Sequence, residues 1–160
     1  MKLHVAALIT ATALTALAAS AQESTKSKDQ VPSQGAEEES HGPGLGEIMS
    51  LQQMRHIKLW FAGRAANWPL VDYEIGELKE GFEDVNKLLG GDTIEKAVGG
   101  PISAMEKAVE SKDRAAFTAA FDKLSAGCNS CHRTLNRGFI VIQRPTVLPY
   151  SNQSFAPEKP

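Results

Sequence analysis

The sequence predicts an all-α fold: an antiparallel four-helix bundle followed by an irregular C-terminal tail. Apolar residues recur at helical spacing in several stretches between residues 44 and 137. Short segments rich in Gly, Pro or Asn separate these stretches. Without its first 21 residues the chain keeps 160 − 21 = 139 residues, a length that supports one domain around one core.

Residues 1–21 have the pattern of a secretory signal peptide. Lys2 precedes an apolar run, and Ala19-Ser20-Ala21 supplies small residues at the cleavage positions. The apolar run is too short for a membrane span, although an uncleaved N-terminal anchor is the alternative. We therefore expect a bacterial protein that is periplasmic or secreted and has no stable membrane span after cleavage.

Residues 22–43 are predicted to form a disordered polar linker because they show no hydrophobic period. The first helix is expected over 44–66, with one stripe of residues facing the core: Leu45, Ile48, Met49, Gln52, His56, Leu59, Trp60 and Gly63. Asn67-Trp68-Pro69 ends it, and the second helix is expected over 69–89.

The third helix, 94–110, is predicted to be kinked or split because Gly99-Gly100-Pro101 interrupts it. The fourth helix is expected over 111–137, ending at Gly138 as the C′ residue. Its core stripe contains Phe117, Phe121, Leu124, Cys128, Cys131 and Leu135. The tail, 138–160, is rich in proline, and its apolar residues 139–142 are expected to fold back over the bundle.

Both cysteines of the chain lie in one pentapeptide, Cys128-Asn129-Ser130-Cys131-His132. Cys-x-x-Cys-His is the attachment signature of c-type haem. Residues i and i+3 of a helix share a face, so both thiols can join the vinyl groups of one haem. His132 then follows as the proximal iron ligand. We expect one covalently bound haem c per chain.

Three other interpretations of the two cysteines fit the sequence less well. A thioredoxin-type redox pair needs a βαβ context, whereas these flanks are helical. A zinc site needs a second pair of ligands, which the sequence does not offer. A disulfide across one helical turn would be strained.

The helical pattern over 44–137, with Cys-x-x-Cys-His in the last helix, resembles the class II c-type cytochromes of the cytochrome c′ type. The resemblance implies an antiparallel four-helix bundle with haem near one end. This chain has Leu135 and Asn136 where that family usually has an aromatic and then a basic residue, and its tail extends past the usual end. Residues 55–63 and 138–145 also look like those of predicted bacterial haem proteins without an assigned function.

The ligand on the other side of the iron would decide the function. His56 is expected as the possible distal ligand, with Met49 as the alternative, because both lie on the core stripe of the first helix. Two protein ligands favour electron transfer, whereas a five-coordinate iron favours binding of NO or CO. A redox-partner or assembly subunit with a mainly structural haem is a third hypothesis.

The balance of charged residues limits the kinds of partner that the protein is expected to bind. Without Lys2 the mature chain would carry 17 − 1 = 16 basic against 19 acidic residues, and no basic stripe indicates nucleic acid. We expect redox partner proteins, and the sequence leaves a homodimer open. No catalytic set of an enzyme is visible. Five basic residues could pair with haem propionates: Arg55, Lys58, Arg133, Arg137 and Arg144.

Overall fold

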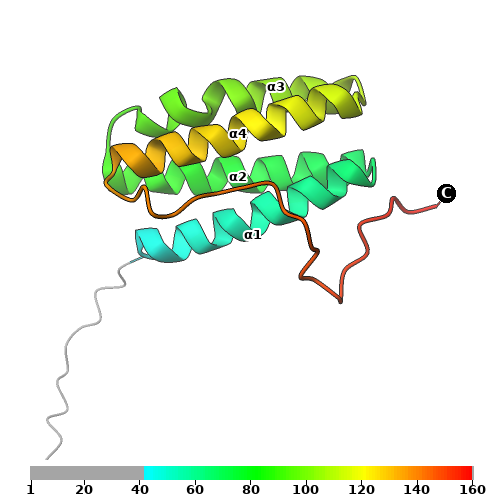
Figure 1. Ribbon diagram of the computed structural model, residues 1–160, viewed down its shortest axis with the longest axis horizontal. Coiled ribbons are helices and arrows are strands. Elements are labelled where there is room, and N and C mark those ends of the chain that lie inside the picture. The colour runs from blue at the N-terminus through cyan, green and yellow to red at the C-terminus, as the bar shows by residue number, and fades with distance from the viewer. Residues whose placement is uncertain (1–41, 160) are drawn as a thin grey trace, which may run out of the picture. The chain divides into compact units, whose positions relative to one another are not determined.

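The computed structural model describes residues 42–159. The expected signal peptide and residues 22–41 of the expected linker lie outside the described residues. The described chain forms an all-helical bundle without a strand, which confirms the expected fold class (Figure 1). Its elements are α1 (Leu45–Arg64), α2 (Trp68–Leu89), the π-helical turn η1 (Glu95–Gly99), α3 (Gly100–Glu110) and α4 (Arg114–Thr134). Within 42–159 no helix is long and apolar enough to cross a membrane.

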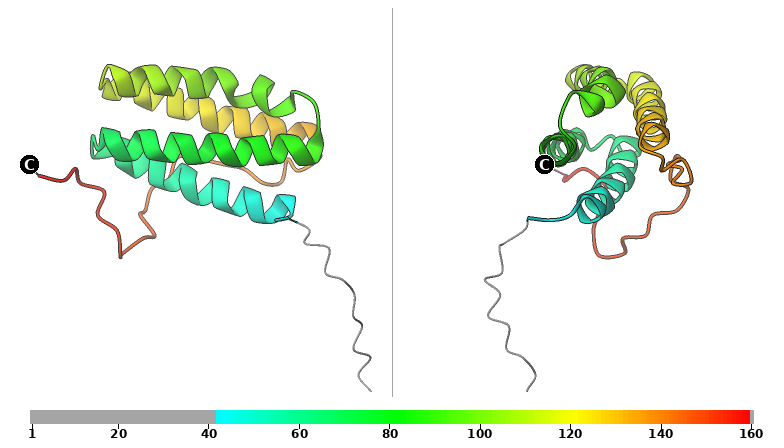
Figure 2. Two further views of the ribbon diagram at one scale, coloured as in Figure 1. Left: turned by 180° about the vertical axis from the view of Figure 1, so that it is seen from behind. Right: turned by 90° about the vertical axis from the view of Figure 1, so that its left-hand side faces the viewer.

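The four helices surround one core. Each packs on the next along the chain, and α1 also contacts α4. The view along the bundle shows this ring (Figure 2, right), and the connections between helices alternate between its two ends (Figure 1). At one end the Arg114 guanidinium donates to the carbonyl of Arg64 at 2.8 Å, so α4 begins where α1 ends. The contacts between α1 and α4 and between α2 and α3 are sparser than the other two in the ring. Residues of both α1 and α4 line the candidate site.

The expected interruption of the third helix takes the form of a π-helical turn and not of a break. Gly99 and Gly100 both keep right-handed helical angles, with φ of −57° and −61°. Pro101 lacks an N–H, so a regular α-helical bond cannot form there. A single π turn absorbs the mismatch without ending the helix.

Helix α4 ends three residues earlier than expected, and Gly138 is not its C′ residue. Asn136 takes the left-handed conformation with φ of 57°. The Arg137 N–H donates to the His132 carbonyl at 2.6 Å, and the Asn136 N–H donates to the Arg133 carbonyl at 3.1 Å. This pair of bonds is a Schellman motif. Asparagine tolerates the left-handed region better than most residues, so it can replace glycine here.

Aromatic side chains fill the centre of the bundle. Phe117 and Phe121 are almost fully buried, and the Trp60 ring centroid lies 4.9 Å from that of Phe121. The apolar stripe of α2 is shifted from the expected one, because Tyr73 is exposed and Glu74 is buried. Burial raises the pKa of the Glu74 carboxyl, against a smaller lowering effect from Lys58.

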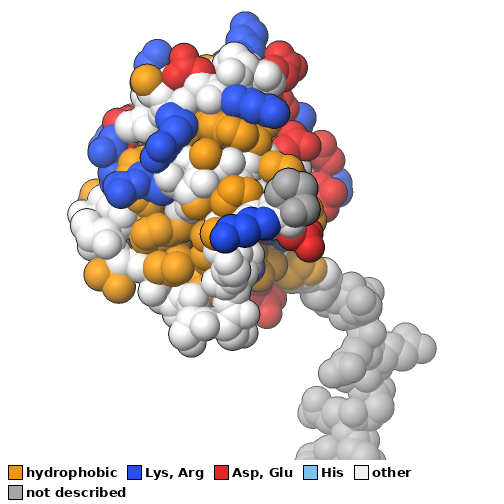
Figure 3. Space-filling model, turned by 90° about the vertical axis from the view of Figure 1, so that its right-hand side faces the viewer, with side chains coloured by type: hydrophobic (Ala, Val, Ile, Leu, Met, Phe, Trp, Pro, Cys, Tyr) orange, Lys and Arg blue, Asp and Glu red, His pale blue; other side chains and the backbone are white. Residues whose placement is uncertain are grey.

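The C-terminal tail folds back along the α1–α4 side of the bundle, as expected (Figure 1). Its apolar run is less covered than expected, because Phe139, Ile140 and Val141 stay exposed and only Ile142 is partly buried. The Arg144 guanidinium pairs with both carboxylate oxygens of Asp122 on α4 and lies 4.6 Å from the Trp60 ring centroid. Farther on, Asn67 donates to the carbonyls of Phe155 and Ala156. Figure 3 shows that end of the bundle, where hydrophobic side chains lie between a side rich in Lys and Arg and one rich in Asp and Glu. The tail is therefore fixed at several points along its length.

Candidate functional site

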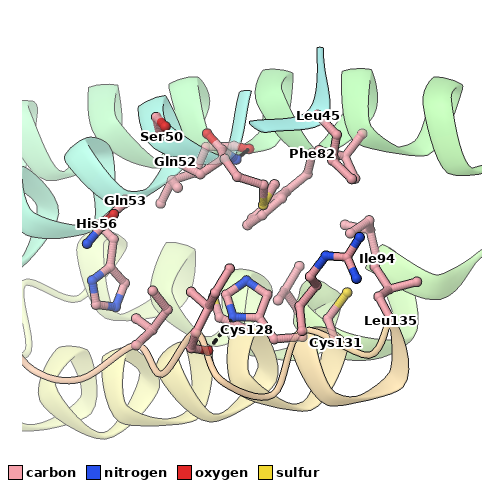
Figure 4. Close-up of a pocket in the computed structure, with 18 of the residues that line it drawn as sticks. Leu45, Ser50, Gln52, Gln53, His56, Phe82, Ile94, Cys128, Cys131 and Leu135 are labelled. Atoms are coloured by element: carbon pink, nitrogen blue, oxygen red, sulfur yellow. Dashed lines mark hydrogen bonds between the residues drawn. The ribbon is translucent and has the colours of Figure 1, made fainter. Parts of the chain in front are cut away.

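A cavity of about 430 Å³ opens between α1, α2, α4 and the tail. Its volume lies in the usual range for sites that hold organic ligands or cofactors. Figure 4 shows Cys128 and Cys131 on one wall, with Gln52 and Phe82 opposite and His56 toward one end. Apolar side chains supply most of the remaining lining, among them Leu45, Leu78, Val85, Leu89, Ile94, Val98, Leu124, Leu135, Ile140 and Ile142.

Both cysteines of the pentapeptide line this cavity. Helix α4 places them one turn apart on its inner face, as their spacing predicts. Burial raises the pKa of the Cys128 thiol to about 11, with a further contribution from the neighbouring Cys131. Burial also raises the pKa of the Cys131 thiol. At neutral pH the pair is therefore two protonated thiols aimed at one apolar space.

His132 lines the same cavity and is held in one orientation by the tail. Its Nδ1 lies 2.9 Å from the carbonyl oxygen of Ile140. A carbonyl can only accept, so Nδ1 is the donor, and in the neutral form of the ring Nε2 keeps its lone pair. An imidazole that ligates a metal typically makes this kind of outer hydrogen bond to a carbonyl or carboxylate.

His56 is buried and also borders the cavity, but one of its nitrogens is already paired. Its Nε2 lies 2.8 Å from the hydroxyl of Ser125, and that hydroxyl donates to the Phe121 carbonyl at 3.0 Å. The hydroxyl oxygen thus accepts from Nε2–H, which leaves Nδ1 as the free lone pair. Desolvation by burial lowers the pKa of His56 to about 4, so the ring is neutral at physiological pH.

Met49 is partly buried and lines the cavity, whereas Met54 does not. Of the basic residues that could pair with haem propionates, two already form ion pairs with carboxylates and one lines the cavity. Arg55 pairs with Glu77 at 2.8 Å, and Arg144 pairs with Asp122. Arg137 lies at the cavity lining.

Two residues that contact the site were not predicted from the sequence. Ser125 lies on the apolar stripe of α4, four residues after Phe121, and a polar residue there requires a partner. The position of Ser125 could therefore have been noticed in the sequence. Asn129, whose side chain binds the backbone of Ile142, gives no such signal because its partner is thirteen residues away in an irregular segment.

The fold and the site together define a four-helix bundle whose last helix presents a Cys-x-x-Cys-His segment to an apolar cavity. No protein-family model, curated protein or solved structure significantly matches the chain. The assignment of function therefore depends on the geometry of this cavity.

Proposed function

We propose that the protein is a monohaem c-type cytochrome of the class II type, with haem attached through Cys128 and Cys131 and iron bound by His132. The observation that carries this proposal is the convergence of both thiols and His132 on one apolar cavity of about 430 Å³. The residues fit the group: two neutral thiols one helical turn apart, and an imidazole whose Nε2 is free. Export of the chain to the periplasm, where such attachment occurs in bacteria, belongs to the same proposal.

Electron transfer is the function that we propose for this haem. When bound, haem supplies a one-electron iron couple, and apolar surroundings with two protein ligands suit it to electron transfer. The chain's own part is to exclude water with apolar side chains from α1, α2 and the tail, and to hold the His132 ring with the Ile140 carbonyl. A redox partner protein would supply or accept the electron.

The register of α1 against α4 favours Met49 over His56 as the second iron ligand. His56 is bonded to Ser125, and His132 lies 132 − 125 = 7 residues beyond Ser125 on α4, or about 10 Å along the axis. Since α4 begins where α1 ends, the same step on α1 leads back 56 − 7 = 49, to Met49. Met49 therefore lies at the level of His132 across the cavity, and His56 lies about two turns away.

The second candidate function is binding of NO or CO at a five-coordinate iron. The observation that favours it is the engagement of His56 Nε2 with Ser125, which leaves α1 without an imidazole at its usual ligating atom. In that case Met49 would pack on the cavity without binding iron. The spectrum of the protein separates the two functions, as described in the Discussion.

The test of the haem proposal is covalent retention. The chain is produced in a bacterium with haem-attachment machinery, denatured, and extracted with acidified organic solvent. Haem should stay with the polypeptide, and a Cys128→Ala/Cys131→Ala double variant should lose it. Haem that passes into the solvent from the wild-type protein would reject the proposal.

A further inference from the structure

We propose that Asn129 is a positioning residue for His132 and acts through the backbone of the C-terminal tail. The inference deepens the proposed function and rests on it, because it concerns the residue that would bind the iron. Asn129 occupies one of the two variable positions of the pentapeptide, where the attachment chemistry itself makes no demand on the side chain.

The Asn129 side chain makes two hydrogen bonds to one residue of the tail. Its Nδ2 donates to the carbonyl of Ile142 at 2.7 Å, and the Ile142 N–H donates to its Oδ1 at 2.7 Å. Both bonds are short, and together they fix the position and the direction of the tail at Ile142. We call this paired contact the Asn129 clamp.

The clamp lies next to the contact between the tail and His132. Asn129 and His132 are three residues apart on α4 and share a face. Ile140 and Ile142 are two residues apart in the tail, and the carbonyls of both face α4, where they accept from His132 and Asn129. Fixing the Ile142 carbonyl over Asn129 therefore also fixes the Ile140 carbonyl over the His132 Nδ1, where it accepts at 2.9 Å.

Few other contacts could hold Ile140 in place. Its N–H donates to the Arg137 carbonyl at 2.9 Å, which closes the turn leading out of α4. The next fixed point is the pair of Arg144 with Asp122. The intervening side chains give little packing, since Phe139 is 79% exposed and Val141 is 69% exposed. Ile140 itself lines the cavity but is still 44% exposed. Among the described residues, the clamp and the bond to His132 itself are the only side-chain hydrogen bonds to the tail between Ile140 and Gln143.

The consequence is electronic as well as geometric. A hydrogen bond from Nδ1 fixes the tautomer and the ring orientation, and it makes Nε2 a stronger base toward iron. A more basic ligand stabilises ferric iron more than ferrous iron, so loss of the clamp should raise the reduction potential. Each tenfold change in the ratio of the two affinities corresponds to about 59 mV for one electron.

The experiment compares three holoproteins: the wild type, Asn129→Ala and Ser130→Ala. Ser130 is the matched control, because it holds the other variable position of the pentapeptide and its exposed side chain lies outside the clamp. Redox titration should show a higher potential for Asn129→Ala and an unchanged one for Ser130→Ala. Limited chymotrypsin cleavage at Phe139 should be faster for Asn129→Ala alone. If Asn129→Ala does not accumulate, Asn129→Gln, which displaces the same amide by one methylene, should give both changes.

The outcomes separate this inference from the proposed function. A wild-type chain that fails to retain haem rejects the proposed function and, with it, the positioning role of Asn129. Retained haem with an unchanged potential in Asn129→Ala rejects the positioning role alone, whether or not cleavage becomes faster. An equal shift in Ser130→Ala also rejects it, because the effect would then not come from the clamp.

Discussion

His56 Nε2 lies 2.8 Å from the Ser125 hydroxyl, and this bond joins α1 to α4 deep in the bundle. The His56 ring also lies 4.3 Å, centroid to centroid, from that of Phe121. A polar pair in an apolar core is stable only while both members are satisfied. The bond therefore sets the register of the two helices that enclose the candidate site.

Replacing Ser125→Ala should lower the free energy of unfolding by about 1–3 kcal/mol, because the buried His56 N–H would lose its acceptor. Urea denaturation followed by circular dichroism measures the change. Ser50→Ala is the matched control: Ser50 is exposed on α1, and its hydroxyl bonds only the Gly46 carbonyl of its own helix. That variant should stay within about 0.5 kcal/mol of the wild type. Equal losses in the two variants would contradict the role assigned to the buried pair.

Stability should fall as the pH is lowered from about 6.5 toward 4. The folded protein keeps His56 neutral, with a pKa near 4, whereas the unfolded chain takes up a proton near the ordinary pKa of 6.5. The unfolded state then binds more protons, so acid favours unfolding, by at most about 3 kcal/mol for a shift of this size. Unfolding curves at several pH values measure the slope. His56→Gln cannot titrate and should show a flatter profile; a profile equal to that of the wild type would count against this explanation.

Gly127→Ala should destabilise the protein by about 1–3 kcal/mol or more through overpacking. A Cβ at Gly127 would collide with the backbone carbonyl of Ala97 in η1, and backbone cannot move aside as a side chain can. Gly76→Ala is the control, since Gly76 lies in the exposed interior of α2 with open space around its Cα. It should stabilise the helix by about 0.5–1 kcal/mol. Thermal unfolding compares the two variants, and a neutral Gly127→Ala would show that α4 and η1 are less closely packed than described.

Ala66→Gly should stabilise the protein by about 1 kcal/mol. Ala66 has φ of 56° in the Schellman motif that ends α1, a conformation that costs a residue with a Cβ about 1–2 kcal/mol. Its neighbour Ala65 has φ of −80°, so Ala65→Gly gains nothing and should be neutral or destabilising. Chemical denaturation of the pair measures the difference. A loss of stability in Ala66→Gly would argue against the left-handed turn.

The spin state of the iron, read from the absorption spectrum, tests which residue is the second protein ligand. In the holoprotein Met49→Ala should convert a low-spin spectrum to a high-spin one and speed the binding of carbon monoxide, because Met49 lines the cavity with His132 and is the ligand that we propose. Met54→Ala is the control, since Met54 does not line the cavity. His56→Ala should leave the spin state unchanged. A low-spin spectrum lost only in His56→Ala would assign the ligand to His56, and a wild-type spectrum that is already high-spin would favour the gas-binding function.

The helices and their inward faces could be predicted from the sequence by itself, because helical periodicity is a local property that burial only reinforces. The stripe of α1 from Ile48 to Gly63 is buried largely as expected, and so is that of α4. The placement of the two thiols could be predicted for the same reason, since their spacing of three residues puts both on one face of α4. The third helix is interrupted at the expected place, although the sequence did not indicate that a π turn would form there. The prediction for the end of α4 was wrong, because Asn136 takes the place expected for Gly138.

Only the tertiary structure decided which distant groups meet. The pairing of His56 with Ser125 spans 69 residues, and that of Asn129 with Ile142 joins a helix to an irregular tail. Neither pairing follows from periodicity, because each depends on the relative rotation of packed helices or on the path of a segment without repeating structure. The structure also brings Met49 and His132 to one cavity and places the Ile140 carbonyl on the His132 imidazole. The sequence by itself determined which residues could bind a haem; packing decided how each of them is oriented, since orientation comes from contacts between segments far apart in the chain.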